Sequence, residues 1–375
     1  MKRFIMVLVN LLFVGIFTFA FLFLPSVAGA QSPQAKCGKW SIVSSPNPGM
    51  FNGLSGVAAL SPGDVWAVGR FSGNNGNDQT LVEHWDGAAW SVISSPNQGM
   101  SATLNGVATI ASNNVWAVGA SVNGKSFNVL IEHWDGSSWS IVPSHDPGTG
   151  DSLDGVAAIA SNDVWAVGSS SGQTLTEHWN GKKWSIVPTP ASTNASLIGI
   201  AAIASNDVWA VGSSNNQTLT ENWDGTAWSI VPSLNIVNSN FNGVSAVPNS
   251  TNLFAVGNYV KGKNSLEKTL VGQWNGTSWS KINSPNVSKK DLGLSSVAAL
   301  SSNNAWAVGG AIDPNTFQAR ALIEQWNGSK WKIARSPLVN GFLDGVTTVP
   351  SSNILWAVGT TISGRTVTES YCSKQ

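Results

Sequence analysis

One tetrapeptide recurs along the chain and constrains its fold more than any other feature. Trp-Ala-Val-Gly occurs six times, and a seventh copy reads Phe-Ala-Val-Gly. The copies begin 44 to 52 residues apart, at Trp66, Trp116, Trp165, Trp209, Phe254, Trp306 and Trp356. Repeats of this length indicate a propeller or a solenoid, in which each unit buries its apolar surface against its neighbours.

Each unit predicts four short strands. In the first unit we expect them at residues 54–60, 64–69, 80–85 and 90–94. Turn sequences such as Ser-Pro-Gly-Asp and Asp-Gly separate them. The strands are nearly continuous apolar runs, as expected for sheets covered on both faces. The pattern predicts an all-β fold, a seven-bladed β-propeller with four antiparallel strands per blade. The alternative is an open β-solenoid, whose coils are usually shorter.

A second landmark follows each tetrapeptide and carries a family resemblance. After a variable loop the chain reads Glu-His-Trp-Asp-Gly-x-x-Trp or a close variant, first at Glu83–Trp90. A strand that ends in Val-Gly, followed by this aromatic-turn-Trp element, resembles the kelch-type blade of galactose-oxidase-like propellers. The resemblance covers residues 37–375. This sequence differs from that family in having a single glycine after most second strands. Only Gly309-Gly310 forms the glycine pair that is typical of the family.

The two ends of the repeat region complement each other. The last unit has a third strand ending at Tyr371 but no fourth, and residues 37–43 match the fourth strands of other units. We therefore expect the N-terminal strand to complete the last blade and close the ring. On the repeat frame Cys37 and Cys372 replace the turn that joins these strands elsewhere. They predict a disulfide, which an oxidising compartment permits; the alternative is two unpaired thiols.

The N-terminus predicts export. Lys2 and Arg3 precede an apolar run that ends before Pro25, and Ala28-Gly29-Ala30 fits a signal-peptidase site. We expect residues 1–30 to be a signal peptide and residues 31–375 to be a propeller that is secreted or held at the cell surface. The alternative is an uncleaved anchor, because the apolar run is long enough to span a bilayer.

Composition excludes some partners. Only 11% of residues are charged, with 20 basic and 20 acidic side chains. We therefore expect no nucleic-acid binding, and no membrane contact beyond the signal segment. All 19 Trp residues occupy repeat-defined positions: six in the tetrapeptide, six ending third strands and seven beginning fourth strands. This assigns them to blade packing rather than to a sugar-binding platform.

A recurring Glu-His pair looks at first like acid–base or metal chemistry. The acidic position holds Glu83, Glu132, Glu177, Glu221, Glu324 and Glu369. The position after it holds His84, His133, His178, Asn222, Gln273, Gln325 and Ser370. These latter side chains share hydrogen-bonding capacity but not metal affinity, and equivalent positions on different blades point apart. We expect structural hydrogen bonds, no metal site and no cofactor.

Two sets of residues are candidate binding positions. The connections between second and third strands and between blades vary in length, and in a propeller both emerge on one face. Variable loops on a rigid scaffold commonly bind ligands, although they can also simply tolerate insertions. The loop candidates are Arg70, His145, Asp146, Asp151, Asp313 and Arg320.

The second set contains one residue per blade, near the start of the innermost strand. Each of these residues directly precedes Gly-Val or one of its variants, Ser-Val and Gly-Ile. These residues should ring the mouth of the central channel. The ring offers a site for a cation or a small polar ligand, with ordered water as the alternative occupant. Its members are Ser55, Asn105, Asp154, Ile198, Asn242, Ser295 and Asp344.

These features predict an exported, monomeric, non-catalytic binding module whose variable-loop face engages an extracellular glycan or protein. One alternative is an extracellular polysaccharide hydrolase or lyase that uses Asp146, Asp151 or Asp313. Another is a structural envelope protein. No His-Glu-x-x-His metal-binding motif occurs in the sequence.

Overall fold

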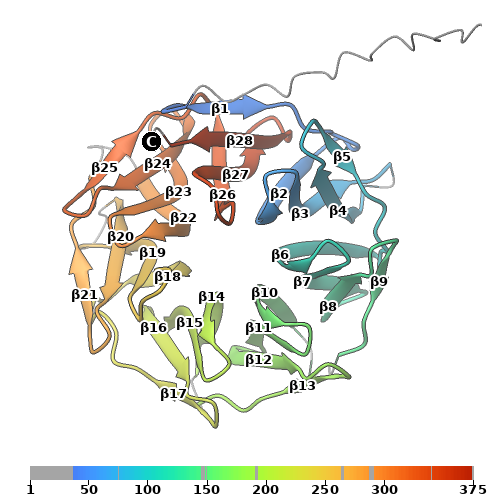
Figure 1. The fold of residues 1–375 in the computed structure, drawn as a ribbon, viewed down its shortest axis with the longest axis horizontal. Coiled ribbons are helices and arrows are strands. Elements are labelled where there is room, and N and C mark those ends of the chain that lie inside the picture. The colour runs from blue at the N-terminus through green and yellow to red at the C-terminus, as the bar shows by residue number, and fades with distance from the viewer. Residues whose placement is uncertain are drawn as a thin grey trace, which may run out of the picture. The chain divides into compact units, whose positions relative to one another are not determined.

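A computed structural model describes residues 37–373 except 75, 145–147, 149, 191–192, 263–265, 287–290 and 339. Two binding candidates, His145 and Asp146, and the expected signal peptide lie outside the described residues. The described chain forms seven four-stranded sheets that radiate around a central axis (Figure 1). Every strand pair in them is antiparallel, so the seven-bladed propeller is confirmed. Within these residues no helix is long and apolar enough to cross a membrane.

The blades are numbered along the chain, and each sheet runs from the channel outward in chain order, except where the ring closes. Blade one contains β2 (Asn52–Ser61), β3 (Asp64–Ser72), β4 (Asp78–Trp85) and β5 (Trp90–Val92). Blade two contains β6 (Ser101–Ala111), β7 (Asn114–Asn123), β8 (Ser126–Trp134) and β9 (Trp139–Ile141). Blade three contains β10 (Asp151–Ala160), β11 (Asp163–Ser170), β12 (Gln173–Trp179) and β13 (Trp184–Ile186). Blade four contains β14 (Ala195–Ala204), β15 (Asp207–Ser214), β16 (Gln217–Trp223) and β17 (Trp228–Ile230).

The remaining three blades repeat this order. Blade five contains β18 (Ser239–Ala246), β19 (Leu253–Val260), β20 (Glu267–Trp274) and β21 (Trp279–Ile282). Blade six contains β22 (Asp291–Ser301), β23 (Asn304–Ile312), β24 (Ala319–Trp326) and β25 (Trp331–Ala334). Blade seven contains β26 (Gly341–Thr348), β27 (Ile354–Thr361), β28 (Thr366–Cys372) and β1 (Trp40–Val43). The outermost strands have three or four residues, which limits the exposed sheet edge that each blade presents.

Aromatic side chains hold neighbouring blades together. The second-strand Trp of each blade packs against two aromatic residues of the following blade, with ring centroids 4.5–6.0 Å apart. Trp66 contacts Trp134 and Trp139 in this way. Phe254 replaces the Trp in blade five, and Tyr371 replaces the third-strand Trp in blade seven. All 19 Trp are buried or half-buried, so their predicted packing role is confirmed.

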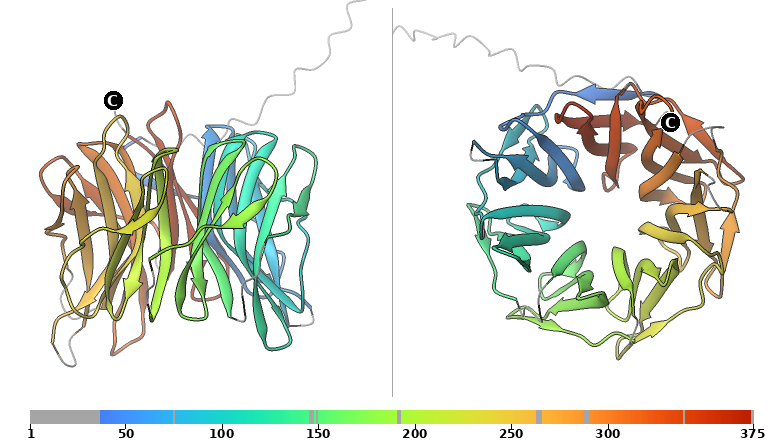
Figure 2. Two further views of the ribbon diagram at one scale, coloured as in Figure 1. Left: turned by 90° about the horizontal axis from the view of Figure 1, so that it is seen from below. Right: turned by 180° about the vertical axis from the view of Figure 1, so that it is seen from behind.

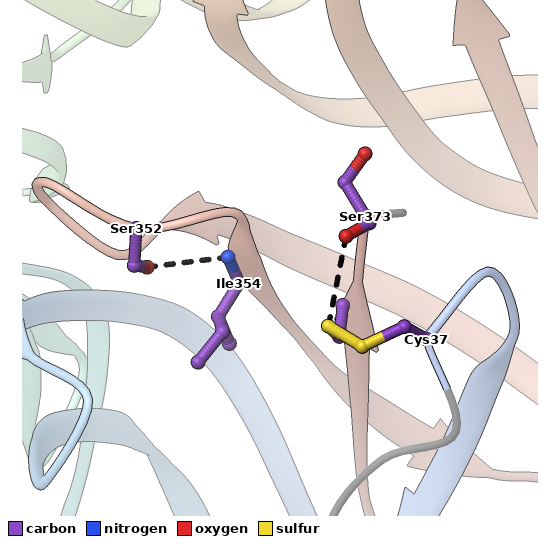
Figure 3. Close-up of a disulfide and its surroundings, with 5 residues drawn as sticks. Cys37, Ser352, Ile354 and Ser373 are labelled. Carbon is purple, nitrogen blue, oxygen red and sulfur yellow. Dashed lines mark hydrogen bonds between the residues drawn. A yellow bond between two sulfur atoms is a disulfide. The ribbon is translucent and has the colours of Figure 1, made fainter. Parts of the chain in front are cut away.

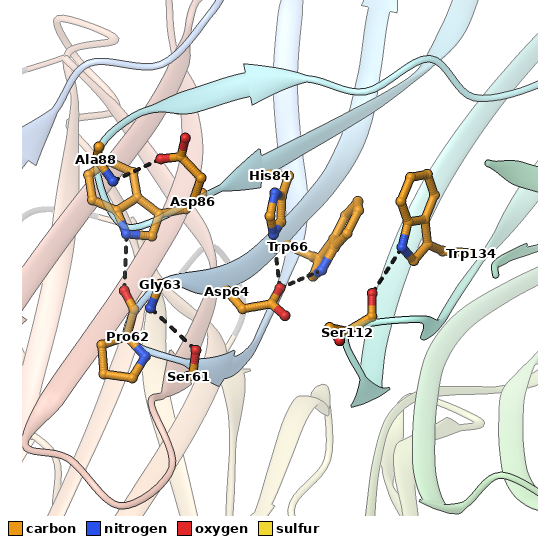
Figure 4. Close-up of polar contacts among 11 residues, drawn as sticks. Ser61, Pro62, Gly63, Asp64, Trp66, His84, Asp86, Ala88, Ser112 and Trp134 are labelled. Carbon is orange, nitrogen blue, oxygen red and sulfur yellow. Dashed lines mark hydrogen bonds and ion pairs between the residues drawn. The ribbon is translucent and has the colours of Figure 1, made fainter. Parts of the chain in front are cut away.

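The third-strand Trp also fixes the turn between the first two strands. The indole of Trp85 donates to the carbonyl oxygen of Pro62 at 3.1 Å, and that of Trp134 donates to Ser112 at 3.0 Å (Figure 4). A buried indole N–H therefore satisfies a turn carbonyl while its ring fills the blade interface. The same bond recurs in blades three, four and six.

The ring closes as the sequence predicts. Strand β1 pairs with β28, with Trp40 opposite Tyr371 (Figure 1). Cys37 and Cys372 form a disulfide with their Cα atoms 4.4 Å apart (Figure 3). The backbone N–H of Gly38 also donates to the carbonyl of Cys372 at 2.6 Å. In the other blades a four-residue turn makes this connection, so the disulfide is the covalent substitute for it.

Candidate functional site

The central channel is lined by one bulged residue from each blade. Between the first and second strands the register slips, and one residue of the first strand leaves the ladder. Such bulges redirect a side chain. The bulged residues are Ser55, Asn105, Asp154, Ile198, Asn242, Ser295 and Asp344, which line a cavity of about 380 Å³. The predicted ring is therefore present as geometry, and its role in ligand binding stays a prediction.

Glycine follows the bulge because neighbouring blades nearly touch there. A Cβ atom on Gly155 would lie 2.7 Å from the carbonyl oxygen of Ile198 in the next blade, and one on Gly56 would lie 2.8 Å from that of Asn105. Six blades have glycine at this position. Blade six has Ser296, whose hydroxyl accepts the backbone N–H of Val346 in blade seven at 3.2 Å. The bulge therefore sets the spacing of the blades as well as the lining of the channel.

The channel carries two carboxyl groups whose ionisation is suppressed. Burial raises the pKa of Asp154 and of Asp344 to about 6 each. The Asn105 side chain donates to Asp154 at 3.1 Å and to the Leu153 carbonyl at 3.0 Å, which partly offsets the rise for Asp154. The negative charge of the channel lining should therefore decrease as the pH falls through about 6.

The variable loops occupy one face of the propeller, and Figure 2 shows that loops emerge at both of its ends. We use the term variable face for the end of the propeller formed by the connections between second and third strands and by the linkers between blades. These two classes bond to each other: the N–H of Asn215 donates to the Asn194 carbonyl at 3.1 Å, and that of Ile362 to the Asn340 carbonyl at 3.3 Å. The opposite end, the uniform face, has four-residue turns between third and fourth strands in six blades. Its turns between first and second strands have two residues except in blades five and seven, where they are longer.

The described loop candidates have different environments. Arg70 is half-exposed, pairs with Asp78 at 2.8 Å and lies over the ring of Phe51. Asp313 accepts the backbone N–H groups of Asn315 and Thr316, which commits its carboxylate to its own turn. Arg320 is exposed on β24.

Asp151 differs from the expectation of an accessible loop carboxylate. It begins β10 and is fully buried. Its carboxylate accepts the backbone N–H of Gly148 at 2.9 Å and so holds the preceding linker in place. Asn52 has the same role in blade one, where it accepts the N–H of Gly49 at 2.8 Å. The sequence could have indicated this, because both residues begin an innermost strand.

Exposed apolar side chains gather on the variable face. Among the described residues, the five most exposed large apolar side chains all belong to its loops and linkers: Met50 at 88%, Phe317 at 78%, Val237 at 61%, Met100 at 60% and Ile362 at 57%. None of the exposed large apolar residues of the described chain lies in a turn of the uniform face. The two faces therefore differ in surface chemistry as well as in loop length.

The histidine position has the structural role that the sequence predicts. His84 and His178 bond through Nε2 to Asp64 and Asp163 at 2.9 and 2.8 Å, and each ring packs on the tetrapeptide Trp of its blade (Figure 4). His133 bonds Asn114 in the same way at 2.9 Å. In blade four Asn222 replaces the histidine and donates to Asp207 at 3.0 Å. The described residues contain no group of three or more His, Cys, Asp or Glu side chains that could hold a metal ion.

The glutamates are buried, and sequence reasoning missed their partners. A hydroxyl from the linker of the preceding blade reaches the carboxylate in four interfaces: Ser95 with Glu132, Ser144 with Glu177, Ser284 with Glu324 and Ser336 with Glu369. Burial raises the pKa of five of these carboxyl groups, to about 8 for Glu83 and Glu324 and to about 7 for Glu132, Glu221 and Glu369. A sequence signal existed: a serine or threonine follows 12 residues after the glutamate position in blades one to six.

Blade five replaces the glutamate. Gly272 occupies its position, and the space is filled by the ring of Phe241, whose tip would lie 2.8 Å from a Cβ atom on that glycine. The other six blades have Leu at the position of Phe241. In blade five a Phe ring therefore occupies the place that the buried Glu side chain has in the other six blades.

The comparison with solved structures finds the same fold in several propellers of low sequence identity. YCF48 from Cyanidioschyzon merolae superimposes with a TM-score of 0.59 and 16% identity over 89% of this chain and 99% of that one. A structure of YCF48 bound to a D1 peptide gives a TM-score of 0.58 and 16% identity, with 89% and 97% covered. The WD40 repeats of RRP9 give 0.59 and 13%, with 90% and 99% covered.

These likenesses bear on the fold alone, because the identities are low. No family model matches the sequence. A search of curated proteins also finds no match. The resemblance to kelch-type blades in particular stays a prediction.

Proposed function

We propose that this protein is an exported, non-catalytic propeller whose variable face binds another protein through a peptide segment. The observation that carries the proposal is the asymmetry of the two faces. Loops of differing length and the most exposed apolar side chains share one face, whereas the other has short polar turns. Exposed apolar patches on a rigid scaffold are typical of protein-binding surfaces.

Two further observations support a protein partner. One structural neighbour, YCF48, is described in complex with a D1 peptide, so a propeller of this fold can bind a peptide. The Trp side chains, which could have stacked on sugars, are engaged in blade packing. The disulfide between Cys37 and Cys372 favours an oxidising compartment and so supports export.

An enzymatic role receives less support from the geometry. Of the three acidic residues considered for catalysis, Asp151 is buried against its linker and Asp313 caps its own turn. The channel ring, with Asp154 and Asp344 in its lining, remains a candidate site for a small ligand.

Selection of binding peptides tests the proposal. A phage-displayed random-peptide library is panned on the mature protein, and a glycan array is probed in parallel. We expect enriched peptides whose binding is weakened by Met50→Ser and Phe317→Ser on the variable face. Lys182→Ser and Lys183→Ser, on a turn of the uniform face, serve as the matched control. The proposal fails if no peptide is enriched, or if both pairs of substitutions affect binding equally.

A further inference from the structure

Blade six contains a cavity between its third strand and the linker that follows its fourth strand. It lies on the outer flank at the variable face, where β24 extends beyond the four-residue strand β25 and only the following linker covers it. Its volume is about 610 Å³. A second cavity of about 510 Å³ adjoins it towards blade seven and shares Ala334, Arg335 and Pro337 with it. We call the first of these cavities, in blade six, the groove.

Small side chains create this groove. Ala321 stands where five other blades have Thr and one has Val. Ala334 stands where every other blade has Val or Ile. In blade one the equivalent Thr80 fills the space and bonds the linker residues Ser95 and Pro96. Blade six lacks both the volume and these bonds, so the linker leaves an opening.

The same exchange leaves a backbone donor without its usual acceptor. In blades one, five and seven the N–H of this strand residue donates to a linker asparagine, at 2.8 Å for Thr80 and Asn97. The repeat places Leu338 where that asparagine stands. By the same register, the outward N–H of Ala321 faces the groove, and no described side chain accepts it.

Two arginines flank the opening. Arg320 and Arg335 both line the cavity and both are exposed. Neither makes an ion pair with any described residue. The adjoining cavity adds Lys39 at its wall. Guanidinium groups that have no ion-pair partner among the described residues, beside an aliphatic pocket with an outward N–H donor, complement a carboxylate that has an apolar neighbour.

We infer that this groove, defined by Ala311, Arg320, Ala321, Leu322, Arg335 and Leu338, binds an acidic peptide segment of a partner protein. A partner carboxylate, from Asp, Glu or a chain end, pairs with the two arginines, and an adjacent apolar side chain enters the pocket. Aliphatic walls suit a peptide better than an acidic sugar, which would be expected to stack on an exposed aromatic ring. The inference rests on the proposed function, since it specifies the partner's chemistry at one part of the variable face.

The peptides selected by phage display provide the probe. We expect them to contain Asp or Glu next to an apolar residue, and replacing that acid by its amide should weaken binding about tenfold or more. Arg320→Gln and Arg335→Gln should each weaken binding about three- to tenfold, more at low than at high salt. Arg365→Gln is the matched control, because Arg365 has the repeat position of Arg320 in blade seven but lies outside the cavity.

A second variant fills the groove with the residues of its sister blades. Ala321→Thr with Ala334→Val should retain or raise the melting temperature and abolish peptide binding. Enriched peptides that lack acidic residues, or that bind all these variants as well as the native protein, overturn this inference while the proposed function stands. A library that yields no binder overturns both. Binding of oligogalacturonate at the two arginines without any acidic peptide overturns it in favour of an anionic glycan.

Discussion

The hydroxyl of Ser95 donates a 2.8 Å hydrogen bond to the carboxylate of Glu132 across the boundary between blades one and two. Ser95 ends one blade and Glu132 lies in the third strand of the next, so the bond couples adjacent blades. Equivalent pairs recur around the ring, and most of the glutamates in them are buried with raised pKa values. The propeller therefore buries proton-binding groups at its interfaces.

Stability should fall as the pH rises from about 5 to about 8. The pKa values of Glu83 and Glu324 are raised from 4.5 to about 8, and those of Glu132, Glu221 and Glu369 to about 7. The folded state then binds more protons than the unfolded state, and the stabilisation is complete below pH 4.5 and is lost as the pH passes the folded pKa values. At about 1.36 kcal/mol per unit the five shifts set an upper limit of roughly 20 kcal/mol, and we expect a loss of several kcal/mol, measured by denaturant unfolding at several pH values.

The control for this prediction is the double variant Glu83→Gln and Glu324→Gln, which should flatten the pH dependence. His133 contributes in the opposite sense, because burial lowers its pKa, but it is one group against seven, the five glutamates with Asp154 and Asp344. A stability that is constant or rises between pH 5 and 8 would contradict the prediction.

Removing the disulfide should destabilise the ring without changing its fold. The loop between Cys37 and Cys372 spans 335 residues, for which chain entropy gives at most about 5–6 kcal/mol. We expect Cys37→Ser with Cys372→Ser to lower the unfolding midpoint, and dithiothreitol to do the same to the native protein. The double variant should not respond to dithiothreitol. If the native protein keeps its unfolding midpoint after full reduction, verified by thiol titration, the disulfide contributes no measurable stability.

Close packing at the channel predicts a sharp difference between two glycines. Gly155→Ala would place a Cβ atom 2.7 Å from the Ile198 carbonyl, and backbone cannot yield easily. We expect a loss of about 1–3 kcal/mol in the free energy of unfolding. Gly293→Ala, also on an innermost strand but with nothing within 4 Å, should change it by less than about 0.5 kcal/mol. Equal effects of the two substitutions in thermal unfolding would rule out blade contact as the reason for glycine.

Blade five allows a test of the polar and apolar interface designs. Phe241→Leu should leave a cavity beside Gly272 and cost about 1–3 kcal/mol, and Gly272→Glu alone should clash with the Phe241 ring. Together they recreate the arrangement of the other blades, with Ser233 in the linker position of the hydroxyl donor. A double-mutant cycle should therefore show favourable coupling. Additive losses would indicate that the two residues are independent.

The repeat made the architecture predictable. The features that the sequence did not predict lie where a blade departs from the repeat or where two blades meet. The count of blades, the closure by residues 40–43 and the disulfide follow from period and register, because every blade faces the same packing problem. The residues of the channel ring were also predictable, since each precedes Gly-Val or one of its variants, Gly-Ile and Ser-Val, in the sequence. The strands extend further at several ends than the pattern indicated: β2 begins at Asn52 and β4 at Asp78.

Contacts between residues of different blades were harder to predict. The buried position of Asp151 depends on a linker that folds back onto it, and the Ser95–Glu132 bond joins neighbouring repeats. The groove of blade six results from three departures from the repeat, at Ala321, Ala334 and Leu338, each unremarkable alone. Only the folded arrangement shows that these small differences fall on one spot.

The pairing of β1 with β28 has a consequence for the order in which the chain acquires structure. Of the propeller's strands β1 is synthesised first and its partner β28 last, so β1 waits for all the other strands before it can join a sheet. Blades one to six can assemble as their residues appear, whereas blade seven forms only after Thr366–Cys372 has emerged. A truncated product would therefore have an open ring and an unpaired cysteine at residue 37. Sheet closure and disulfide oxidation therefore both wait for β28, and the disulfide marks a propeller whose ring has closed.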